Sequence, residues 1–255
     1  MTPLGLFKGE TALVTGSASN IGRAIALALA AEGAHVRCVD VDAERNGAVV
    51  DEIVKAGGRA EAVTADLSTA DGWQSALPAS GPVPDMLVHS ASPPRREVDG
   101  VLSVTEATWD AMQNTNLRSG FFLARELGRR MREGGVKGRM LFITSLHAET
   151  PRNVPHYAAA KAGQTMVVKE LARALGPAGI RINALAPGAV PGGGFNAGAF
   201  DWSAKIPMGR LGKPEDMANM AVALLSDRFS GYVTGTTVAV DGGLALFNWI
   251  PLPTG

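Results

Sequence analysis

The sequence alternates short, almost continuously apolar runs with longer stretches of helical periodicity. The apolar runs predict strands at 11–15, 34–40, 60–65, 85–89, 139–144, 181–186 and 237–240. The stretches between them predict helices at 21–31, 43–56, 105–131, 154–175 and 214–225. Strands that are apolar at nearly every position are typical of a parallel sheet buried on both faces. The alternation therefore predicts a doubly wound α/β fold, a Rossmann-like parallel sheet of about seven strands with helices on both faces.

We expect a single domain over residues 1–255, because no internal repeat or low-complexity linker interrupts this alternation. Two segments depart from it and predict loops, near 92–104, which contains Pro93-Pro94, and near 187–205, which contains Gly192-Gly193-Gly194. Both follow predicted strands, so both should lie at the carboxyl edge of the sheet, where such folds bind ligands. We expect these loops to contact the substrate.

Charge and composition exclude several classes of function. Lys plus Arg and Asp plus Glu number 24 each, which argues against a nucleic-acid partner. The lone cysteine, Cys38, cannot form an internal disulfide, and the N-terminal residues lack the apolar core of a signal peptide, so we expect a cytoplasmic protein. No run reaches 18 apolar residues, so no membrane span is expected. No metal site is predicted either.

A glycine-rich turn follows the first predicted strand and opens a helix, in the run Val14-Thr15-Gly16-Ser17-Ala18-Ser19-Asn20-Ile21-Gly22-Arg23. Glycines let the backbone approach a pyrophosphate, and the helix N-terminus supplies N–H donors and partial positive charge. We predict that Gly16, Ser19, Asn20 and Ile21 contact a dinucleotide. The alternative is a turn that only connects strand and helix.

Acidic residues at the ends of the next two strands extend this prediction. Asp40 lies 24 residues beyond Gly16, where a carboxylate accepts from the adenosine 2′-hydroxyl and repels a 2′-phosphate. NAD is therefore expected, with NADP less favoured. Asp66 and Leu67 follow the third predicted strand and are expected to hold the adenine edge, although an Asp at a loop start is often only a helix cap.

Tyr157 and Lys161 are four residues apart in a predicted helix and so share one face. A phenol normally keeps its proton until about pH 10, and a neighbouring ammonium group stabilises the phenolate. The pair therefore suits a general base. Ser145, 12 residues before Tyr157 at the end of the fifth strand, is expected to face the phenol. Asn116 is a polar residue among apolar neighbours, either catalytic or a satisfied structural amide.

These residues resemble the short-chain dehydrogenase/reductase family over essentially the whole chain. The resemblance is carried by Thr15-Gly16 and Gly22, Asp66, Asn116, Ser145, Tyr157 with Lys161, Pro187-Gly188, and the tail motifs Gly231-Tyr232-Val233-Thr234-Gly235 and Val240-Asp241-Gly242-Gly243. It implies that Tyr157 is the general base or acid and that Lys161 binds the nicotinamide ribose. Ser145 would hydrogen-bond the reacting oxygen, and Asn116 would anchor a water in a proton relay. Pro187, Gly188 and Val190 would flank the nicotinamide. The resemblance also implies a homotetramer with the 105–131 and 154–175 helices at an interface.

The chain departs from the family pattern at three places. Asn20 stands where the family has its middle glycine, and asparagine tolerates the left-handed conformation better than most residues. The fourth strand ends His89-Ser90-Ala91-Ser92 in place of the usual Asn-Asn-Ala-Gly, which alters the adenosine side, where Ser90 and Ala91 are still expected to contact the cofactor. The usual threonine after Pro187-Gly188 is missing.

Several segments look like the aldose 1-dehydrogenases of the family, which oxidise a pyranose at its anomeric carbon to a lactone. These are Ser145-Leu146-His147-Ala148-Glu149, His156-Tyr157, Ile206-Pro207-Met208-Gly209 and Asp241-Gly242-Gly243-Leu244-Ala245-Leu246-Phe247. The resemblance implies that Ser145, His147 and Asn196 contact a sugar or a related secondary alcohol. The alternative for His147 is a solvated loop histidine.

Two questions stay open at the level of sequence. Arg95, Arg96 and Arg152 are expected to be surface charges, with recognition of an anionic sugar as the alternative. A ketone or 3-oxoacyl reductase of the same family would prefer a phosphorylated cofactor, against which Asp40 argues. A non-catalytic nucleotide-sensing module would have lost Tyr157, Lys161 or Ser145, and all three are present.

Overall fold

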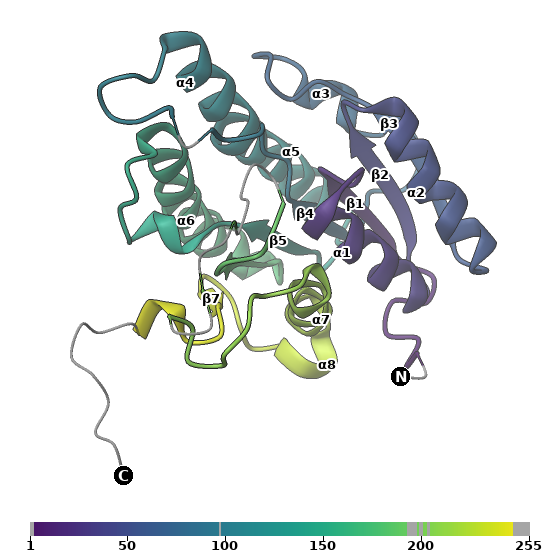
Figure 1. Cartoon of the computed structure of the whole chain (residues 1–255). Coiled ribbons are helices and arrows are strands. Elements are labelled where there is room, and N and C mark those ends of the chain that lie inside the picture. Colours follow the sequence, from purple (N-terminus) through teal and green to yellow (C-terminus); the bar gives the residue numbers. More distant parts are fainter. Residues whose placement is uncertain (1–2, 97, 193–197, 199–200, 203–204, 247–255) are drawn as a thin grey trace.

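The computed structural model describes residues 3–96, 98–192, 198, 201–202 and 205–246. The strands are β1 (Thr11–Thr15), β2 (His35–Asp40), β3 (Arg59–Thr64), β4 (Met86–His89), β5 (Arg139–Ile143), β6 (Arg181–Pro187) and β7 (Thr237–Val240). They form one parallel sheet in the order β3-β2-β1-β4-β5-β6-β7 (Figure 1). The predicted Rossmann-like parallel sheet is thereby confirmed.

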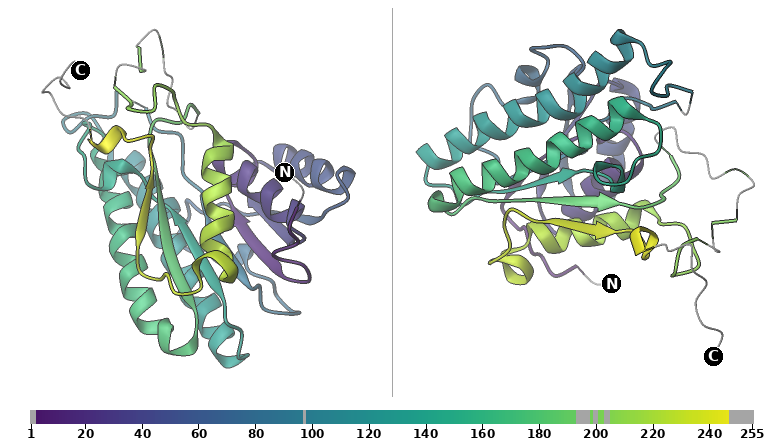
Figure 2. Two further views of the ribbon diagram at one scale, coloured as in Figure 1. Left: turned by 90° about the horizontal axis from the view of Figure 1, so that it is seen from below. Right: turned by 90° about the vertical axis from the view of Figure 1, so that its left-hand side faces the viewer.

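Helices cover both faces of the sheet, as Figure 2 shows. They are α1 (Asn20–Ala31), α2 (Ala43–Lys55), α3 (Trp73–Ala76), α4 (Glu106–Met112), α5 (Ser119–Glu133), α6 (Pro155–Leu175), α7 (Pro214–Leu225) and α8 (Asp227–Ser230). Side chains of α1, α2 and α7 pack on one face of the strands, and those of α3, α5 and α6 pack on the other. Burial on both faces explains why the inner strands β1, β4 and β5 carry so few polar residues, whereas the edge strand β3 is largely exposed.

The helix predicted at 105–131 is three elements, because a π turn, η1 (Gln113–Arg118), separates α4 from α5. π turns are rare and often occur at functional sites. Short 3₁₀ turns follow at η2 (Leu146–Ala148), η3 (Gly176–Ala178) and η4 (Leu244–Leu246). Within the described ranges, no helix has both the length and the apolar character that crossing a membrane requires.

The position of β1 between β2 and β4 determines where a ligand can bind. The chain leaves β1 toward β2 on one side and later returns to β4 on the other, so the connections diverge at the carboxyl ends of β1 and β4. Such a switch point leaves a crevice that open α/β sheets use for ligands. The predicted loops after β4 and β6 start at this same edge (Figure 1).

Candidate active site

A cavity of about 650 Å³ opens at this carboxyl edge and contains most of the predicted site residues. Its wall includes Gly16, Ser19, Asn20, Ile21, Asp40, Asp66, Leu67, Ser90, Ala91, Ser145, His147, Tyr157, Lys161, Pro187, Gly188 and Val190. Two predicted residues are not in this set. Asn116 does not line the cavity, and Asn196 lies outside the described residues.

The glycine-rich turn forms one end of the cavity. Gly16 has a left-handed backbone with φ of 69°, and a Cβ there would lie 2.7 Å from the backbone nitrogen of Ala91. A Cβ on Gly22 would overlap the carbonyl oxygen of Gly16. Both positions therefore need glycine, since the turn folds onto itself and onto the end of β4. The result is a tight backbone cradle at the N-terminus of α1, where N–H groups favour an anion.

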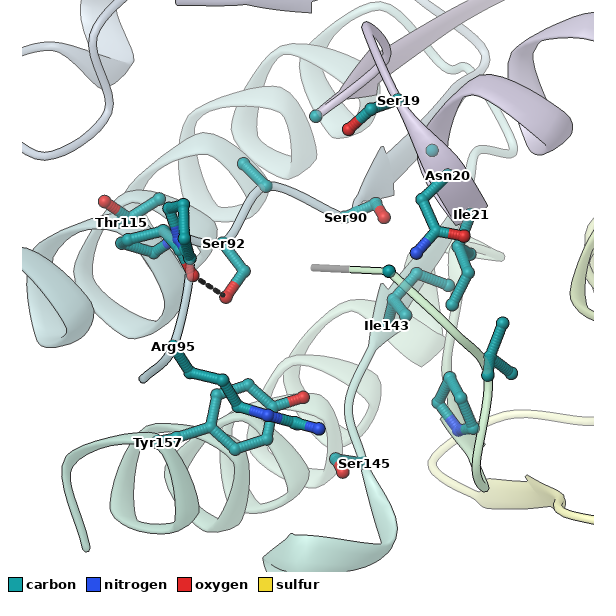
Figure 3. A pocket seen from close by; sticks show the side chains of 18 of the residues that line it. Ser19, Asn20, Ile21, Ser90, Ser92, Arg95, Thr115, Ile143, Ser145 and Tyr157 are labelled. Carbon is teal, nitrogen blue, oxygen red and sulfur yellow. Dashed lines mark hydrogen bonds between the residues drawn. The ribbon is translucent and has the colours of Figure 1, made fainter. Parts of the chain in front are cut away.

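Asn20 keeps this turn intact in place of the family's glycine. Its φ of 48° is left-handed, as expected for asparagine at such a position. Its side-chain amide donates to the carbonyl oxygen of Pro191 at 3.2 Å, and so connects the turn to the loop after β6. Asn20 and Ile21 both line the cavity on this side (Figure 3).

Asp40 ends β2 beside the turn with its carboxylate held in place. Oδ2 accepts from the backbone N–H of Ala18 and Oδ1 from that of Asp42, each at 3.0 Å. Each carboxylate oxygen retains a further lone pair, so these bonds orient the group without exhausting it. Asp66 follows β3, and hydrogen bonds from Ser68 hold the pKa of its carboxyl below the usual value. This end of the cavity is therefore acidic.

Tyr157 and Lys161 both project from α6 at the other end. The Lys161 ammonium lies 5.5 Å from the centroid of the Tyr157 ring and donates to the carbonyl oxygen of Ile143 at 2.7 Å. Lys161 is only 3% exposed. Burial, helped by the positive charge of Arg95, lowers the pKa of Lys161 to about 7. A buried amine beside a half-buried phenol is the arrangement that the spacing predicted.

Ser145 and His147 come from the segment between β5 and α6. Ser145 is the first residue before η2, and its hydroxyl oxygen accepts from the backbone N–H of His147 at 3.2 Å. That bond leaves the Ser145 O–H able to donate to a ligand. Nδ1 of His147 lies 3.2 Å from the carbonyl oxygen of Thr150. Because a carbonyl only accepts, Nδ1 carries a proton and donates to it. The two rings of His147 and Tyr157 meet edge to face, with centroids 6.1 Å apart.

Asn116 is held away from the cavity by two buried side chains. Nε2 of His89 lies 2.9 Å from its backbone carbonyl oxygen, and Nε2 of Gln164 donates to the same oxygen at 2.8 Å. Its own amide nitrogen donates to the Met112 carbonyl oxygen at 3.2 Å. Asn116 Oδ1 is buried and has no hydrogen-bond partner among the described residues. The π turn thus presents Thr115, not Asn116, to the cavity.

His89 connects the strand ends to this π turn. Its Nδ1 lies 3.0 Å from the Thr15 hydroxyl oxygen, which itself accepts from the backbone N–H groups of Ser90 and Ala91. Burial, followed by the charge of Lys161, lowers the pKa of His89 to about 4, so the ring is neutral near pH 7. The Thr15 hydroxyl therefore donates to Nδ1, and Nε2–H donates to Asn116. Only the departure from the family's asparagine signalled this residue in the sequence.

Two of the arginines expected at the surface line the cavity, Arg95 half-buried and Arg152 still exposed. The guanidinium carbon of Arg95 lies 4.9 Å from the Tyr157 ring centroid, and the side chain extends across that ring (Figure 3). Arg152, in the segment that leads into α6, also contributes to the wall. Arg96 is exposed and does not line the cavity. The sequence does not predict this contact, because Arg95 and Tyr157 are far apart in the chain and meet only when the loop after β4 folds over α6.

Comparison with known proteins places the chain among oxidoreductases of this fold. A family model described as enoyl-(acyl carrier protein) reductase matches residues 16–245. L-rhamnose 1-dehydrogenase (NAD(P)(+)) of Azotobacter vinelandii is 35% identical over 92% of this chain and 96% of its own length. Glucose 1-dehydrogenase 2 of Bacillus subtilis is 34% identical over 94% and 96%. A crystal structure of a 3-oxoacyl-[acyl-carrier protein] reductase with bound NAD from Brucella melitensis has a TM-score of 0.86, with 32% identity over 94% of this chain and 93% of that one.

Proposed function

Because this chain belongs to the short-chain dehydrogenase/reductase family, we propose that it is an NAD-dependent dehydrogenase that oxidises a sugar at C1 to a lactone, or a related secondary alcohol. The observation that carries the proposal is the meeting of Tyr157, Lys161 and Ser145 in one cavity with a glycine-rich turn. A single domain would perform both the binding and the chemistry. A nucleotide-sensing module without catalysis has no need of this grouping.

The cavity residues fit a dinucleotide along its length. The backbone cradle of Gly16 and Gly22 suits a pyrophosphate, and the fixed carboxylate of Asp40 suits ribose hydroxyls. Ser19, Asn20 and Ile21 would complete the phosphate side, with Asp66, Leu67, Ser90 and Ala91 around the adenosine and Pro187, Gly188 and Val190 around the nicotinamide. Bound here, NAD would supply the acceptor for the hydride that the substrate carbon loses.

Three side chains would then act on the substrate hydroxyl, each in a different role. Tyr157 removes its proton as general base, and Ser145 donates a hydrogen bond that orients the oxygen. In its protonated form, Lys161 places positive charge one helical turn from the phenol and favours the ionised form of Tyr157. The backbone carbonyl oxygen of Asn116 already accepts from His89 and Gln164. If Asn116 holds a relay water, it would do so through its buried side-chain Oδ1.

A sugar suits the polar groups on the reaction side of the cavity. The imidazole of His147 and the O–H donor of Ser145 lie on one segment of the cavity wall, and both are groups that hydrogen-bond the hydroxyls of a pyranose. Similarity to two sugar 1-dehydrogenases supports the same class of substrate. Asn196, expected to join them, falls in a stretch that the structure does not describe.

A screen for NAD reduction tests the proposed function directly. Neutral aldoses, acidic aldoses, polyols and secondary alcohols are offered in turn, with NADH formation as the readout and lactone as the product assayed. Oxidation of an aldose to its lactone supports the proposal. Activity with secondary alcohols and none with any sugar would remove the aldose assignment and leave a dehydrogenase of another substrate.

The second candidate is a 3-oxoacyl or ketone reductase. It is favoured by the match to a family model of a reductase and by the similarity to a 3-oxoacyl reductase structure. Oxidation of NADPH or NADH by a 3-oxoacyl thioester, faster than NAD reduction by any sugar, would establish it. The tightly held Asp40 favours the NAD-dependent alternative, because a carboxylate repels a 2′-phosphate.

Removing the Asp40 carboxylate should weaken the choice of NAD over NADP. For Asp40→Ala we expect the ratio of kcat/KM for NAD to that for NADP to fall by about tenfold or more, since charge-assisted hydrogen bonds to the ribose are lost and repulsion of the phosphate is relieved. Asp51→Ala, an exposed residue of α2 outside the cavity, is the matched control. An unchanged ratio in Asp40→Ala would mean that this carboxylate does not contact the ribose.

Replacing Lys161 with methionine should stabilise the fold while it impairs catalysis. The unfolded lysine titrates near pH 10.5 and the folded one near 7. Between these values the unfolded chain binds more protons, so the wild-type free energy of unfolding rises with pH across that window. The free energy of unfolding of Lys161→Met should therefore exceed that of wild type by a few kcal/mol at or below about pH 7. This difference should disappear as the pH rises toward 10.5. Urea unfolding across this range measures it.

Lys169→Met is the control for that comparison, because Lys169 is exposed on the same helix. We expect its unfolding curve to follow wild type at every pH. If Lys161→Met were only as stable as wild type at pH 6, burial of the charged Lys161 would not lower the free energy of unfolding as predicted. Loss of activity in this variant is expected from its proposed role and is measured separately.

We further propose the homotetramer and the cytoplasmic location that the sequence suggests. Trp109 of α4 and Met166 of α6 are large apolar side chains that are 38% and 55% exposed, and both lie in the segments expected at an interface. Covering them with another copy of the chain would remove apolar surface from water. Light scattering on the purified protein gives the assembly state, and a monomeric mass would reject the tetramer.

A further inference from the structure

His89 lies buried between two segments of the cavity wall. It ends β4, is fully buried and does not line the cavity itself. The family pattern has asparagine at this position, and the chemistry proposed above gives His89 no part. Its neighbour Ser90 and Thr115 of the π turn both line the cavity (Figure 3). Burying an imidazole at this junction is costly unless both ring nitrogens are hydrogen-bonded.

One ring nitrogen of His89 orders the wall beside the glycine-rich turn. Nδ1 accepts from the Thr15 hydroxyl at 3.0 Å, and the same hydroxyl oxygen accepts from the backbone N–H groups of Ser90 and Ala91 at 3.2 and 3.3 Å. These three bonds use the full capacity of the hydroxyl. Ala91 in turn lies against Gly16, where a Cβ would be 2.7 Å from the Ala91 nitrogen. Nδ1 therefore fixes the segment that packs behind the turn.

The other ring nitrogen of His89 holds the π turn. Nε2–H donates to the backbone carbonyl oxygen of Asn116 at 2.9 Å, and Gln164 of α6 donates to the same oxygen at 2.8 Å. The π turn is thus attached to β4 through His89 and to α6 through Gln164, three residues beyond Lys161. Burial, followed by the charge of Lys161, lowers the pKa of His89 to about 4. The neutral ring has one donor and one acceptor, as these two bonds require.

Gly120 of α5 provides the room that this ring needs. A Cβ at Gly120 would lie 2.7 Å from Cδ2 of His89, 2.9 Å from Nε2, and 3.0 Å from Cε1 of Phe142. The Phe142 ring meets the imidazole edge to face, with centroids 5.7 Å apart. Packed between Gly120 and Phe142, the imidazole keeps the orientation in which both nitrogens are bonded.

We propose that His89 is a positioning residue that holds the glycine-rich turn and the π turn in fixed relation, Nδ1 acting on cofactor binding and Nε2 on catalysis. The inference rests on the proposed function in assigning dinucleotide binding to the turn, but not on the substrate being a sugar. Through Nδ1, Ser90 and Ala91 are ordered for the cofactor. Through Nε2, Thr115 keeps its place in the wall and the π turn its place beside α6. Misplacement by about 1 Å costs about 10²-fold in rate, so this link affects turnover from outside the cavity.

Two substitutions separate the roles of the two nitrogens. The amide oxygen of His89→Asn reaches about as far from the backbone as Nδ1 and still accepts from Thr15, but the shorter side chain does not reach Asn116. The amide nitrogen of His89→Gln reaches about as far as Nε2 and still donates to Asn116, but Thr15 loses its acceptor. We expect His89→Gln to weaken NADH binding by about fivefold or more and to keep kcat at saturating NAD within about twofold of wild type. His89→Asn should lower kcat by about tenfold or more and keep NADH affinity within about twofold.

The same two substitutions at His35 are the matched control. His35 begins β2 at the amino edge of the sheet and does not line the cavity. Both His35 variants should keep the wild-type kcat and NADH affinity, which are measured with the substrate found in the screen and by calorimetry. A histidine that only stabilises the fold gives no division between the two quantities. If both His89 variants changed kcat and NADH affinity by the same factor, or behaved like the His35 variants, the proposal would be wrong.

Hydrogen exchange tests the two links without any substrate. Mass spectrometry of short overlapping peptides should show faster exchange of the backbone N–H groups of Gln113–Arg118 in His89→Asn, and of Ser90 and Ala91 in His89→Gln, by about fivefold or more. Failure of wild type to bind NADH would reject the proposed function, whereas this exchange pattern would still support the two links. Exchange that changes equally in both segments, or in neither, would overturn the positioning role.

Gly120→Ala displaces the imidazole without replacing it, and so tests the link even where a His89 variant fails to fold. The new Cβ crowds Cδ2 and Nε2, so we expect kcat to fall as in His89→Asn while NADH affinity stays close to wild type. In the His89→Asn background the same substitution should cost less, because the shorter side chain leaves room for the methyl group. Losses in kcat that multiply in the double variant, or a wild-type kcat in Gly120→Ala, would contradict the proposal.

Discussion

Tyr157→Phe should lower kcat by about 10²–10⁴-fold, the contribution that a general base makes, and leave the affinity for NADH close to wild type. The substitution removes only the hydroxyl. The ring on which Arg95 stacks and which meets His147 edge to face is retained. Loss of turnover in this variant therefore reports the proton transfer and not the packing of the cavity. Stopped-flow or steady-state assays with the substrate found in the screen measure kcat, and calorimetry measures NADH binding.

The chain provides its own control for this substitution. Tyr232 is the only other tyrosine and is fully exposed outside the cavity wall. Tyr232→Phe should retain the wild-type kcat. Turnover at the wild-type rate in Tyr157→Phe would remove the tyrosine from its proposed role, whatever the substrate.

Gly22→Ala should abolish measurable NADH binding and destabilise the fold. The new Cβ would overlap the carbonyl oxygen of Gly16, so the turn must open before the methyl group can fit. Strain of this kind costs about 1–3 kcal/mol, and it displaces the backbone N–H groups proposed to cradle the pyrophosphate. Calorimetric titration with NADH and urea unfolding measure the two effects.

Gly47→Ala supplies the matched substitution with the opposite expected sign. Gly47 also lies within a helix, α2, where a Cβ meets no atom within 4 Å. Alanine is the better helix former, so we expect Gly47→Ala to gain about 0.5–1 kcal/mol of stability and to bind NADH normally. Wild-type NADH affinity in Gly22→Ala would show that cofactor binding does not depend on the close approach of Gly22 to the carbonyl oxygen of Gly16.

The sheet could be predicted from the sequence because its signals are local. Apolar runs of four to seven residues and the turns between them placed every strand within about one residue, and boundaries usually drift by more. The same reasoning found Tyr157, Lys161, Ser145 and Asp40, since each occupies a strand end or a helix face at a definite spacing. Parallel strands bring these positions together without any knowledge of the loops.

What the sequence missed depends on contacts between distant segments. The sequence predicts continuous helix across the π turn at Gln113–Arg118, because a single turn between two α-helices is too short to give a periodicity of its own. The π turn directs Asn116 toward His89 and Gln164 and brings Thr115 to the cavity. Arg95 was expected at the surface for a similar reason, since the fold of a proline-containing loop is not encoded in hydrophobic periodicity.

The hydrogen bond from Asn20 to Pro191 joins residues 171 positions apart. It couples the wall that faces the proposed cofactor phosphates to the loop that faces the proposed substrate. A redesign of residues 187–205 for another substrate would therefore also disturb dinucleotide affinity, and selection for a new cofactor at the turn would shift substrate choice. Through this hydrogen bond the two proposed specificities would depend on each other, so libraries that vary both segments together should yield more functional variants than libraries that vary either one alone.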